Sequence, residues 1–91
     1  MNMGVKVKFF GILRDRVGKK EIDLEDFDKI KDLIESLDEK YGLKEMLIEN
    51  EKLRPYVNIL VNGENIRFKD GLDTKVKSGD QIALFPAAAG G

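Results

Sequence analysis

A chain of 91 residues allows one domain with a single modest core, and its 42% apolar and 36% charged residues are typical of a soluble globular protein. The formal net charge of -1 gives no sign of the basic excess that nucleic acids or anionic membranes attract. No apolar run reaches transmembrane length and no signal-peptide core precedes the first predicted strand, so the sequence predicts a cytoplasmic protein without nucleic-acid or membrane partners.

Two residue types are absent altogether: the chain has no cysteine and no histidine. It therefore lacks a thiolate nucleophile, zinc-thiolate ligands and the usual acid-base side chain near neutral pH. The 17 acidic residues lie in charge-alternating stretches typical of a solvated surface. We expect no bound metal or cofactor and no self-contained active site.

The N-terminal segment predicts a hairpin. Residues 5–9 alternate apolar and charged side chains, the pattern of a strand with one covered face. The odd-numbered side chains should face the core, whereas the even-numbered ones and Phe10 should face the other way. Residues 12–17 fit either a loop or a single helical turn, and residues 21–24 predict the partner strand.

The clearest predicted helix runs from about residue 28 to residue 41. Asp26 or Asp28 can cap its N-terminus, and Gly42 suits the left-handed position after its last turn. Apolar residues at spacings of three and four form one continuous stripe: Phe27, Ile30, Ile34, Leu37 and Tyr41. The stripe indicates core packing.

The C-terminal half predicts three more strands. Residues 43–54 are the hardest to assign and are compatible with a short helix. Residues 56–61 alternate as a strand, Asn62-Gly63 predicts a type I′ turn, and residues 64–68 form the return strand. Residues 81–85 predict the last strand. The order β-β-α-β-β-β predicts an α+β domain, in which one main helix covers a mixed sheet of four to five strands.

The last residues differ from an ordinary polar terminus. After Phe85, Pro86 ends the strand, three alanines follow, and the sequence ends on Gly90 and Gly91. Extended, residues 86–91 reach roughly 18 Å, and glycine lets a backbone pass where no other residue fits. We expect a folded domain over 1–85 and a flexible tail over 86–91, whose terminal carboxylate suits a narrow pocket on another protein.

These features together resemble the β-grasp, ubiquitin-like sulfur carriers, most closely the small subunit of molybdopterin synthase and the small archaeal ubiquitin-like modifiers. The resemblance spans the chain, and its last dozen residues are the most specific part. The matching segments are Phe9-Phe10, Leu13-Arg14, Val61-Asn62-Gly63, and residues 78–86 running into Gly90-Gly91. Residues 87–89 depart from it, since many relatives carry a second proline or a bulkier residue there.

The resemblance implies that the first strand lies beside the last, and the last beside the third. It also implies a mechanism. A partner resembling the ubiquitin-activating enzyme would adenylate the Gly91 carboxylate with ATP, and a sulfur donor would convert it to a thiocarboxylate. The large subunit of molybdopterin synthase would then accept the tail and pass sulfur to a pterin precursor.

The sequence leaves other functions open. In one alternative, activated Gly91 is attacked by a lysine of a target protein, which would make the chain a covalent modifier. A carrier for thiamine thiazole synthesis is a weaker alternative, because those relatives are generally shorter and lack residues 43–54. A binding module with an idle tail is the simplest alternative.

Strand parity predicts a partner surface beside the tail. If the strands adjoin as first, last and third, then Phe10, Leu60 and Phe85 meet on the face that the helix leaves uncovered, next to Pro86. A contiguous apolar patch there is typical of a docking site. The alternative is that Ile12 or Leu13 folds over these side chains and buries them.

Overall fold

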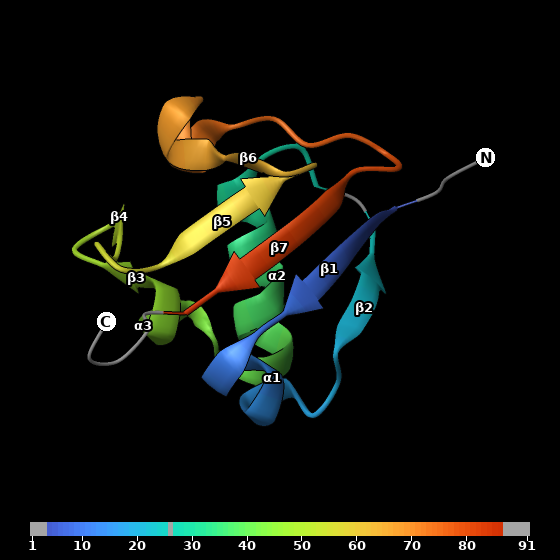
Figure 1. The fold of residues 1–91 in the computed structure, drawn as a ribbon, viewed down its shortest axis with the longest axis vertical. Coiled ribbons are helices and arrows are strands. Elements are labelled where there is room, and N and C mark those ends of the chain that lie inside the picture. Colours follow the sequence, from blue (N-terminus) through green and yellow to red (C-terminus); the bar gives the residue numbers. More distant parts are fainter. Residues whose placement is uncertain (1–3, 26, 87–91) are drawn as a thin grey trace.

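The computed structural model describes residues 4–25 and 27–86 and shows an α+β β-grasp fold, with a mixed sheet lying across one main helix (Figure 1). The five-stranded sheet has the order β2-β1-β7-β5-β6. β1 and β7 pair in parallel, and the other neighbours are antiparallel. The strands are β1 (Val5–Phe9), β2 (Glu21–Leu24), β5 (Asn58–Val61), β6 (Glu64–Asn65) and β7 (Gln81–Phe85). Both the predicted fold class and the predicted strand neighbours are confirmed.

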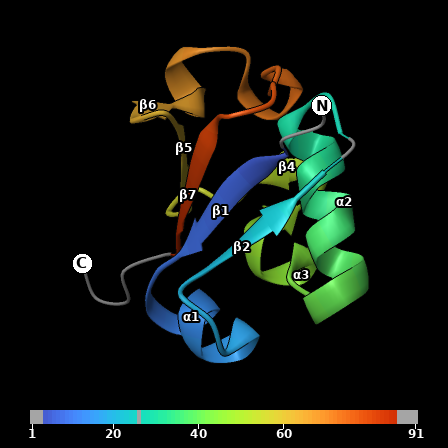
Figure 2. The same ribbon diagram turned by 90° about the vertical axis from the view of Figure 1, so that its right-hand side faces the viewer.

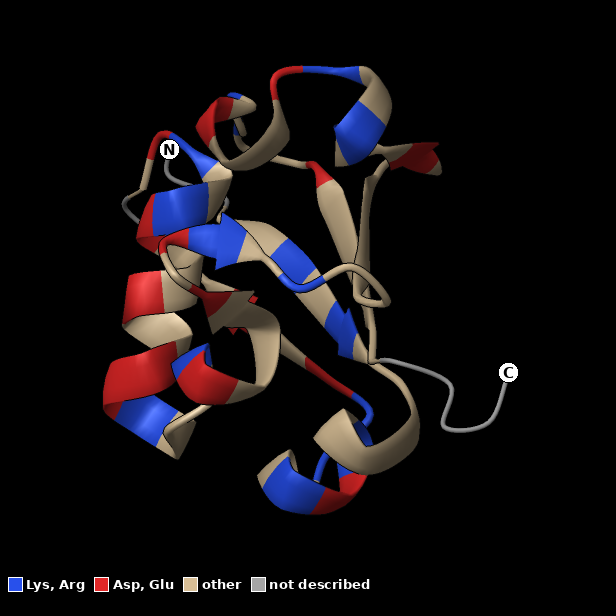
Figure 3. Ribbon diagram, turned by 90° about the vertical axis from the view of Figure 1, so that its left-hand side faces the viewer, with Lys and Arg blue, Asp and Glu red and all other residues tan. Residues whose placement is uncertain are grey.

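The main helix, α2 (Ile30–Tyr41), covers one face of this sheet (Figure 2). The alternation within the strands is the predicted one, because Val5, Val7 and Phe9 are buried while Lys6 and Lys8 are not. The helix buries Ile30, Leu33, Ile34 and Leu37 against the strands. Charged residues band its outer side (Figure 3). We call the sheet face turned away from α2 the open face.

The predicted N-terminal cap of α2 is wrong. Asp26 lies outside the described residues, and the structure has Lys29 at the cap position with no side-chain cap hydrogen bond. The first helical amide, on Ile30, instead donates to the carbonyl of Thr74 at 3.0 Å. A backbone carbonyl from a distant segment thus replaces the expected carboxylate. At the other end, Gly42 takes the predicted left-handed conformation with φ of 67°.

Two short helices and a hairpin complete the domain. The segment that fitted a loop or one turn is α1 (Gly11–Val17), a helix of seven residues. Residues 43–54 do contain a short helix, α3 (Lys44–Leu47). It is followed by an unpredicted hairpin of β3 (Ile48–Glu49) and β4 (Lys52–Leu53). Its turn residues Asn50 and Glu51 have φ of 54° and 64°, which two non-glycine residues gave no reason to expect.

The predicted return strand over 64–68 is too long. The Asn62-Gly63 turn has positive φ at both residues, as a type I′ turn requires. However, pairing stops at Asn65, whose side chain accepts a hydrogen bond from the amide of Arg67 at 2.9 Å. That contact turns the chain into a 3₁₀ helix, η1 (Ile66–Phe68), and a second one, η2 (Gly71–Asp73), follows. Of residues 64–68, only Ile66 is buried.

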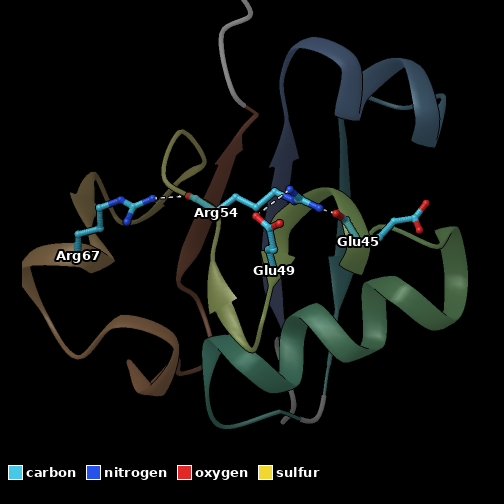
Figure 4. A network of polar contacts seen from close by, with 4 residues as sticks. All are labelled: Glu45, Glu49, Arg54 and Arg67. Atoms are coloured by element: carbon cyan, nitrogen blue, oxygen red, sulfur yellow. Dashed lines mark hydrogen bonds and ion pairs between the residues drawn. The ribbon is translucent and has the colours of Figure 1, made fainter.

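The segment before β5 is held by arginine side chains (Figure 4). Arg67 Nη2 donates to the carbonyls of Arg54, Pro55 and Val57 at 2.6, 3.1 and 2.6 Å. Arg54 in turn donates to the carbonyl of Glu45 at 2.9 Å and pairs with the carboxylate of Glu49 at 3.3 Å. This network ties η1 to α3 and to the start of β5. It also explains why β5 begins at residue 58 and not at 56 as predicted.

Candidate functional site

The candidate site is the place where β7 ends, and Pro86 is the last described residue. Because β1 and β7 are parallel neighbours, Phe10 and Phe85 follow the last paired positions of the two strands. Their rings stack with centroids 4.3 Å apart and planes 11° from parallel. The Phe10 amide donates to the carbonyl of Leu84 at 3.2 Å, which fixes the register at this point. Both rings are half-buried.

Gly11 follows Phe10 and Pro86 follows Phe85, and these two residues also lie close together. Gly11 has φ of 58°, and a Cβ placed on it would lie 2.8 Å from Pro86 Cγ. Such a distance is far inside van der Waals contact, so only glycine allows the proline ring to approach this closely. Pro86 is half-buried. The chain therefore leaves β7 in a direction that Gly11 helps to define.

A cation borders the aromatic pair. The guanidinium carbon of Arg14, on α1, lies 5.5 Å from the centroid of the Phe10 ring. Arg14 Nε also donates to the carbonyl of Phe9 at 3.2 Å. A guanidinium over an aromatic face is a favourable arrangement. It holds α1 beside the end of β1.

Leu60, the third residue of the predicted patch, also lies on the open face, but it is not directly opposite Phe85. Leu60 is opposite Ala83, whereas the residue opposite Phe85 is Asn58. Leu60 is therefore a diagonal neighbour of Phe85 and is half-buried. The structure thus brings Phe10 and Phe85 into contact and places Leu60 near them on the open face.

The two residues that could have covered the patch do not behave alike. Leu13 is fully buried and belongs to the core, so it points away from the open face. Ile12 remains 58% exposed. The aromatic pair remains partly accessible.

The other predicted site residues, Gly90 and Gly91, lie outside the described residues, as does most of the predicted tail. Among residues 4–25 and 27–86, no cluster of acidic side chains could hold a metal ion. Within the same residues, no helix is long and apolar enough to cross a membrane. The resolved pKa shifts belong to surface ion pairs: a hydrogen bond with Glu21 raises the pKa of Lys6, and one with Glu35 raises the pKa of Lys44.

A polar cluster links two of the segments on which the family resemblance rests. Asn62 Nδ2 donates to Asp80 Oδ1 at 2.9 Å, and the amide of Gln81 donates to Asn62 Oδ1 at 2.9 Å. Asp80 is 6% exposed, and its other oxygen accepts from the amide of Lys77 at 2.9 Å. These contacts lie at the start of β7, far along the strand from Phe85. Their role is to fix β7 against β5.

The order and pairing of the strands around one main helix define a ubiquitin-like β-grasp protein. The sequence matches the ThiS family over residues 7–91, and the chain belongs to this family of sulfur carriers. It is 37% identical to small archaeal modifier protein 3 of Haloferax volcanii, covering 98% of this chain and 100% of the relative. It is also 37% identical to the sulfur carrier protein CysO of Mycobacterium tuberculosis, with the same coverage of 98% and 100%.

Solved structures agree with the family assignment. The structure of the Amycolatopsis orientalis BexX/CysO complex contains a chain that matches with a TM-score of 0.87 and 34% identity, over 97% of this chain and 100% of that one. A Pyrococcus furiosus structure named as a putative molybdopterin converting factor, subunit 1, matches with a TM-score of 0.71 and 31% identity, over 94% of this chain and 99% of that one. Sulfur carriers of this kind thus form complexes with partner proteins.

Sequence reasoning missed the part of Gly11 and of Arg14 in this site. Gly11 directly follows the first predicted strand and Phe10, and a glycine at such a position can mark a close approach of another segment. Arg14 was used only for the family resemblance. Its position follows from the length of α1, which the sequence left open.

Proposed function

We propose that this protein is the sulfur carrier of molybdopterin biosynthesis, with Gly91 as the residue that carries the sulfur. The observation that carries the proposal is the match to the ThiS family, which extends through Gly90 and Gly91. The aromatic pair beside Pro86 supports it, because a partner that docks there would lie at the start of the tail. The Pyrococcus relative supports the choice of a pterin precursor as sulfur acceptor.

Two steps convert the Gly91 carboxylate to a thiocarboxylate. A carboxylate oxygen attacks the α-phosphorus of ATP, pyrophosphate leaves, and an acyl adenylate forms. A hydrosulfide equivalent from a sulfur donor then attacks the acyl carbon, AMP leaves, and a thiocarboxylate remains. Both steps take place in the active site of an adenylating enzyme. Since the chain has no cysteine, its own terminus is the one place where it can hold such sulfur covalently.

The acceptor distinguishes this proposal from its alternative. In the proposed function, the large subunit of molybdopterin synthase admits the tail, and the thiocarboxylate sulfur attacks a carbon of the pterin precursor, where it displaces a leaving group. Water then cleaves the resulting thioester, so the sulfur stays on the pterin and Gly91 returns to the carboxylate. In the alternative, a lysine amine attacks the acyl carbon of the adenylate, AMP leaves and an isopeptide bond forms. The similarity to small archaeal modifier protein 3 favours that second function.

Intact mass spectrometry tests the activation step. The protein, incubated with ATP, the adenylating enzyme of its own organism and a sulfur donor, should gain the mass of sulfur replacing oxygen at Gly91. A variant with one alanine added after Gly91 should keep its fold and gain nothing. If the extended variant were converted equally well without processing, the carrier function would be wrong.

A second measurement assigns the acceptor. The thiocarboxylated protein, mixed with the synthase large subunit and a pterin precursor, should yield a sulfur-containing pterin and return to the carboxylate. If no pterin is thiolated, and isopeptide-linked conjugates appear in cell extract instead, the protein is a modifier and the molybdopterin assignment fails.

A further inference from the structure

The turn between β5 and β6 contains a chemically reactive pair of residues that the proposed function does not use. Asn62 is the only asparagine in the sequence that a glycine follows. Asparagine is thermolabile, because the backbone nitrogen of the next residue can attack its side-chain amide carbon. Glycine in the next position hinders this attack least, since it has no Cβ. Asn62 and Gly63 are both exposed, so water reaches them.

The folded structure engages both polar atoms of the Asn62 side chain. Its Nδ2 donates to Asp80 Oδ1 at 2.9 Å, and its Oδ1 accepts from the amide of Gln81 at 2.9 Å. The backbone amide of Asn62 also donates to the carbonyl of Gln81 at 2.8 Å. The side chain is therefore bound to the start of β7. It has to break two hydrogen bonds before its amide carbon can meet the Gly63 nitrogen.

Asp80, which binds the amide nitrogen of Asn62, is itself fixed in place. It is 6% exposed, and its second carboxylate oxygen accepts from the amide of Lys77 at 2.9 Å. Its backbone carbonyl accepts from the amide of Lys6 at 3.1 Å, which joins it to β1. An acceptor held by these contacts keeps the Asn62 side chain in one orientation.

We propose that Asn62 is a deamidation site, which Asp80 keeps closed in the folded protein and which opens when the β5–β6 hairpin separates from β7. In the reaction, the Gly63 nitrogen loses its proton and bonds to Asn62 Cγ, and ammonia leaves. Water then opens the resulting cyclic imide, which yields aspartate or isoaspartate at position 62. The modification needs water and no partner protein, so it goes beyond the proposed function and does not depend on it.

Either product weakens the link between the hairpin and β7. Aspartate at position 62 has no side-chain N–H to donate, and it brings a second negative charge to Asp80. Isoaspartate lengthens the main chain within a two-residue turn, and the length of such a turn sets the register of the strands that it joins. Deamidation therefore records how often the hairpin opens and favours further opening once it has occurred.

Asn50 is a matched control within the same chain. It lies in the turn of the β3–β4 hairpin, it is exposed, and its φ of 54° is close to the 51° of Asn62. The residue after it is Glu51, whose side chain hinders the attack of the backbone nitrogen. If turn geometry and exposure decided the reaction, Asn50 and Asn62 would react alike. If the following glycine decides it, Asn62 alone reacts.

The test follows deamidation of the full chain by tandem mass spectrometry during incubation at mildly alkaline pH. Asn62 should react slowly in the folded wild type and about tenfold faster or more in concentrated urea, whereas Asn50 should stay largely unmodified in both. The folded Asp80→Ala variant should react about tenfold faster than the folded wild type, because a charged acceptor is lost. Gly63→Ala should not react, although its φ of 86° strains an alanine.

A core variant separates local opening from overall stability. Ile34→Val removes one methyl group from a side chain that is 1% exposed, which costs about as much stability as one hydrogen bond. It does not touch the turn, so it should leave the deamidation rate of Asn62 unchanged. If it accelerates the reaction as much as Asp80→Ala does, or if Asp80→Ala reacts at the wild-type rate, Asp80 does not keep the site closed and the proposal is wrong.

Two further measurements do not depend on the folding of Asp80→Ala. In the wild type, the deamidation rate should rise with urea well below the unfolding midpoint, because local opening is enough. A rate that stays flat up to the midpoint would mean that the site opens only on global unfolding, which overturns the proposal. Asn62→Asp should lower the urea midpoint, and Asn50→Asp should leave it unchanged. Equal midpoints for these two variants would contradict the weakening of the β7 link.

Discussion

At the scale of single residues, the position of Pro86 after β7 depends on a close contact of its ring with Gly11. Gly11 is the first residue of α1 and Gly18 follows its last residue, and both have positive φ, of 58° and 80°. A Cβ on Gly11 would meet the Pro86 ring, whereas a Cβ on Gly18 would meet nothing within 4 Å. The two positions therefore separate backbone strain from collision with the start of the tail.

Alanine at each position measures the two effects. Gly18→Ala should cost about 1 kcal/mol of unfolding free energy from φ alone. Gly11→Ala should cost more and should change the NMR signals of the Pro86 ring protons, because the ring must move. Urea unfolding and a nuclear Overhauser contact between residues 11 and 86 measure this. If both variants lose the same unfolding free energy and the Pro86 signals do not change, the contact with Gly11 does not determine the position of Pro86.

The aromatic pair gives a second prediction at this scale. Phe85→Glu removes a ring that stacks on Phe10 at 4.3 Å, so it should cost about 1 kcal/mol of stability. That loss is small beside the several kcal/mol expected for a core phenylalanine. Binding to the adenylating enzyme should weaken far more strongly. Thermal unfolding and calorimetry on one sample compare the two, and global unfolding of the variant would place Phe85 in the core.

At the scale of elements, Arg67 is the residue that fixes the segment before β5. Arg67→Ala removes donors from three carbonyls and should cost about 1–2 kcal/mol. The Val57 amide donates to the carbonyl of Arg54 at 3.1 Å, and in the variant it should exchange its hydrogen with solvent faster than in the wild type. Lys69→Ala, which breaks only the exposed pair with Glu64, should cost about 0.5 kcal/mol or less. Hydrogen exchange followed by NMR checks the prediction, and unchanged Val57 protection in Arg67→Ala would contradict it.

The elements also show where sequence prediction succeeds. Alternation assigned the inward and outward faces of β1, β5 and β7 correctly, and it correctly placed Phe10 beside Phe85. It succeeded because burial of one sheet face permits only one parity. The apolar spacing also predicts α2, although the helix begins at Ile30, after Phe27, and the stripe leaves out the buried Leu33.

The failures have local causes that a sequence pattern does not contain. The β3–β4 hairpin turns through two non-glycine residues with positive φ, and β6 ends because one asparagine side chain bonds to the backbone. The cap of α2 comes from Thr74, a residue far away in sequence. In the candidate site, the Gly11–Pro86 contact depends on the positive φ of Gly11, which the sequence pattern does not predict. The boundary between domain and tail at residue 85, and the roles of Gly90 and Gly91, stay predictions.

At the scale of the whole molecule, basic side chains gather on and after α1, the helix that begins beside the end of β7. Residues 14–20 carry four basic side chains and one acidic, although the chain as a whole has a net charge of -1. They begin on α1, the helix at the bottom of Figure 3, and Lys19 and Lys20 after it are exposed. We therefore expect the adenylating enzyme to carry carboxylates on the surface that meets α1, so that opposite charges steer the two proteins together.

Charge reversal tests this steering. The double change Lys19→Glu and Lys20→Glu should lower the association rate with the adenylating enzyme about tenfold at low ionic strength, and added salt should remove the difference. The control, Lys75→Glu with Lys77→Glu, alters the net charge equally at two exposed positions near the start of α2. It should have a much smaller effect, because these charges do not lie in the basic segment that begins on α1. Stopped-flow association at several salt concentrations measures both variants. Equal slowing by the two pairs would mean that net charge alone governs association and that the basic segment beside α1 has no special part in it.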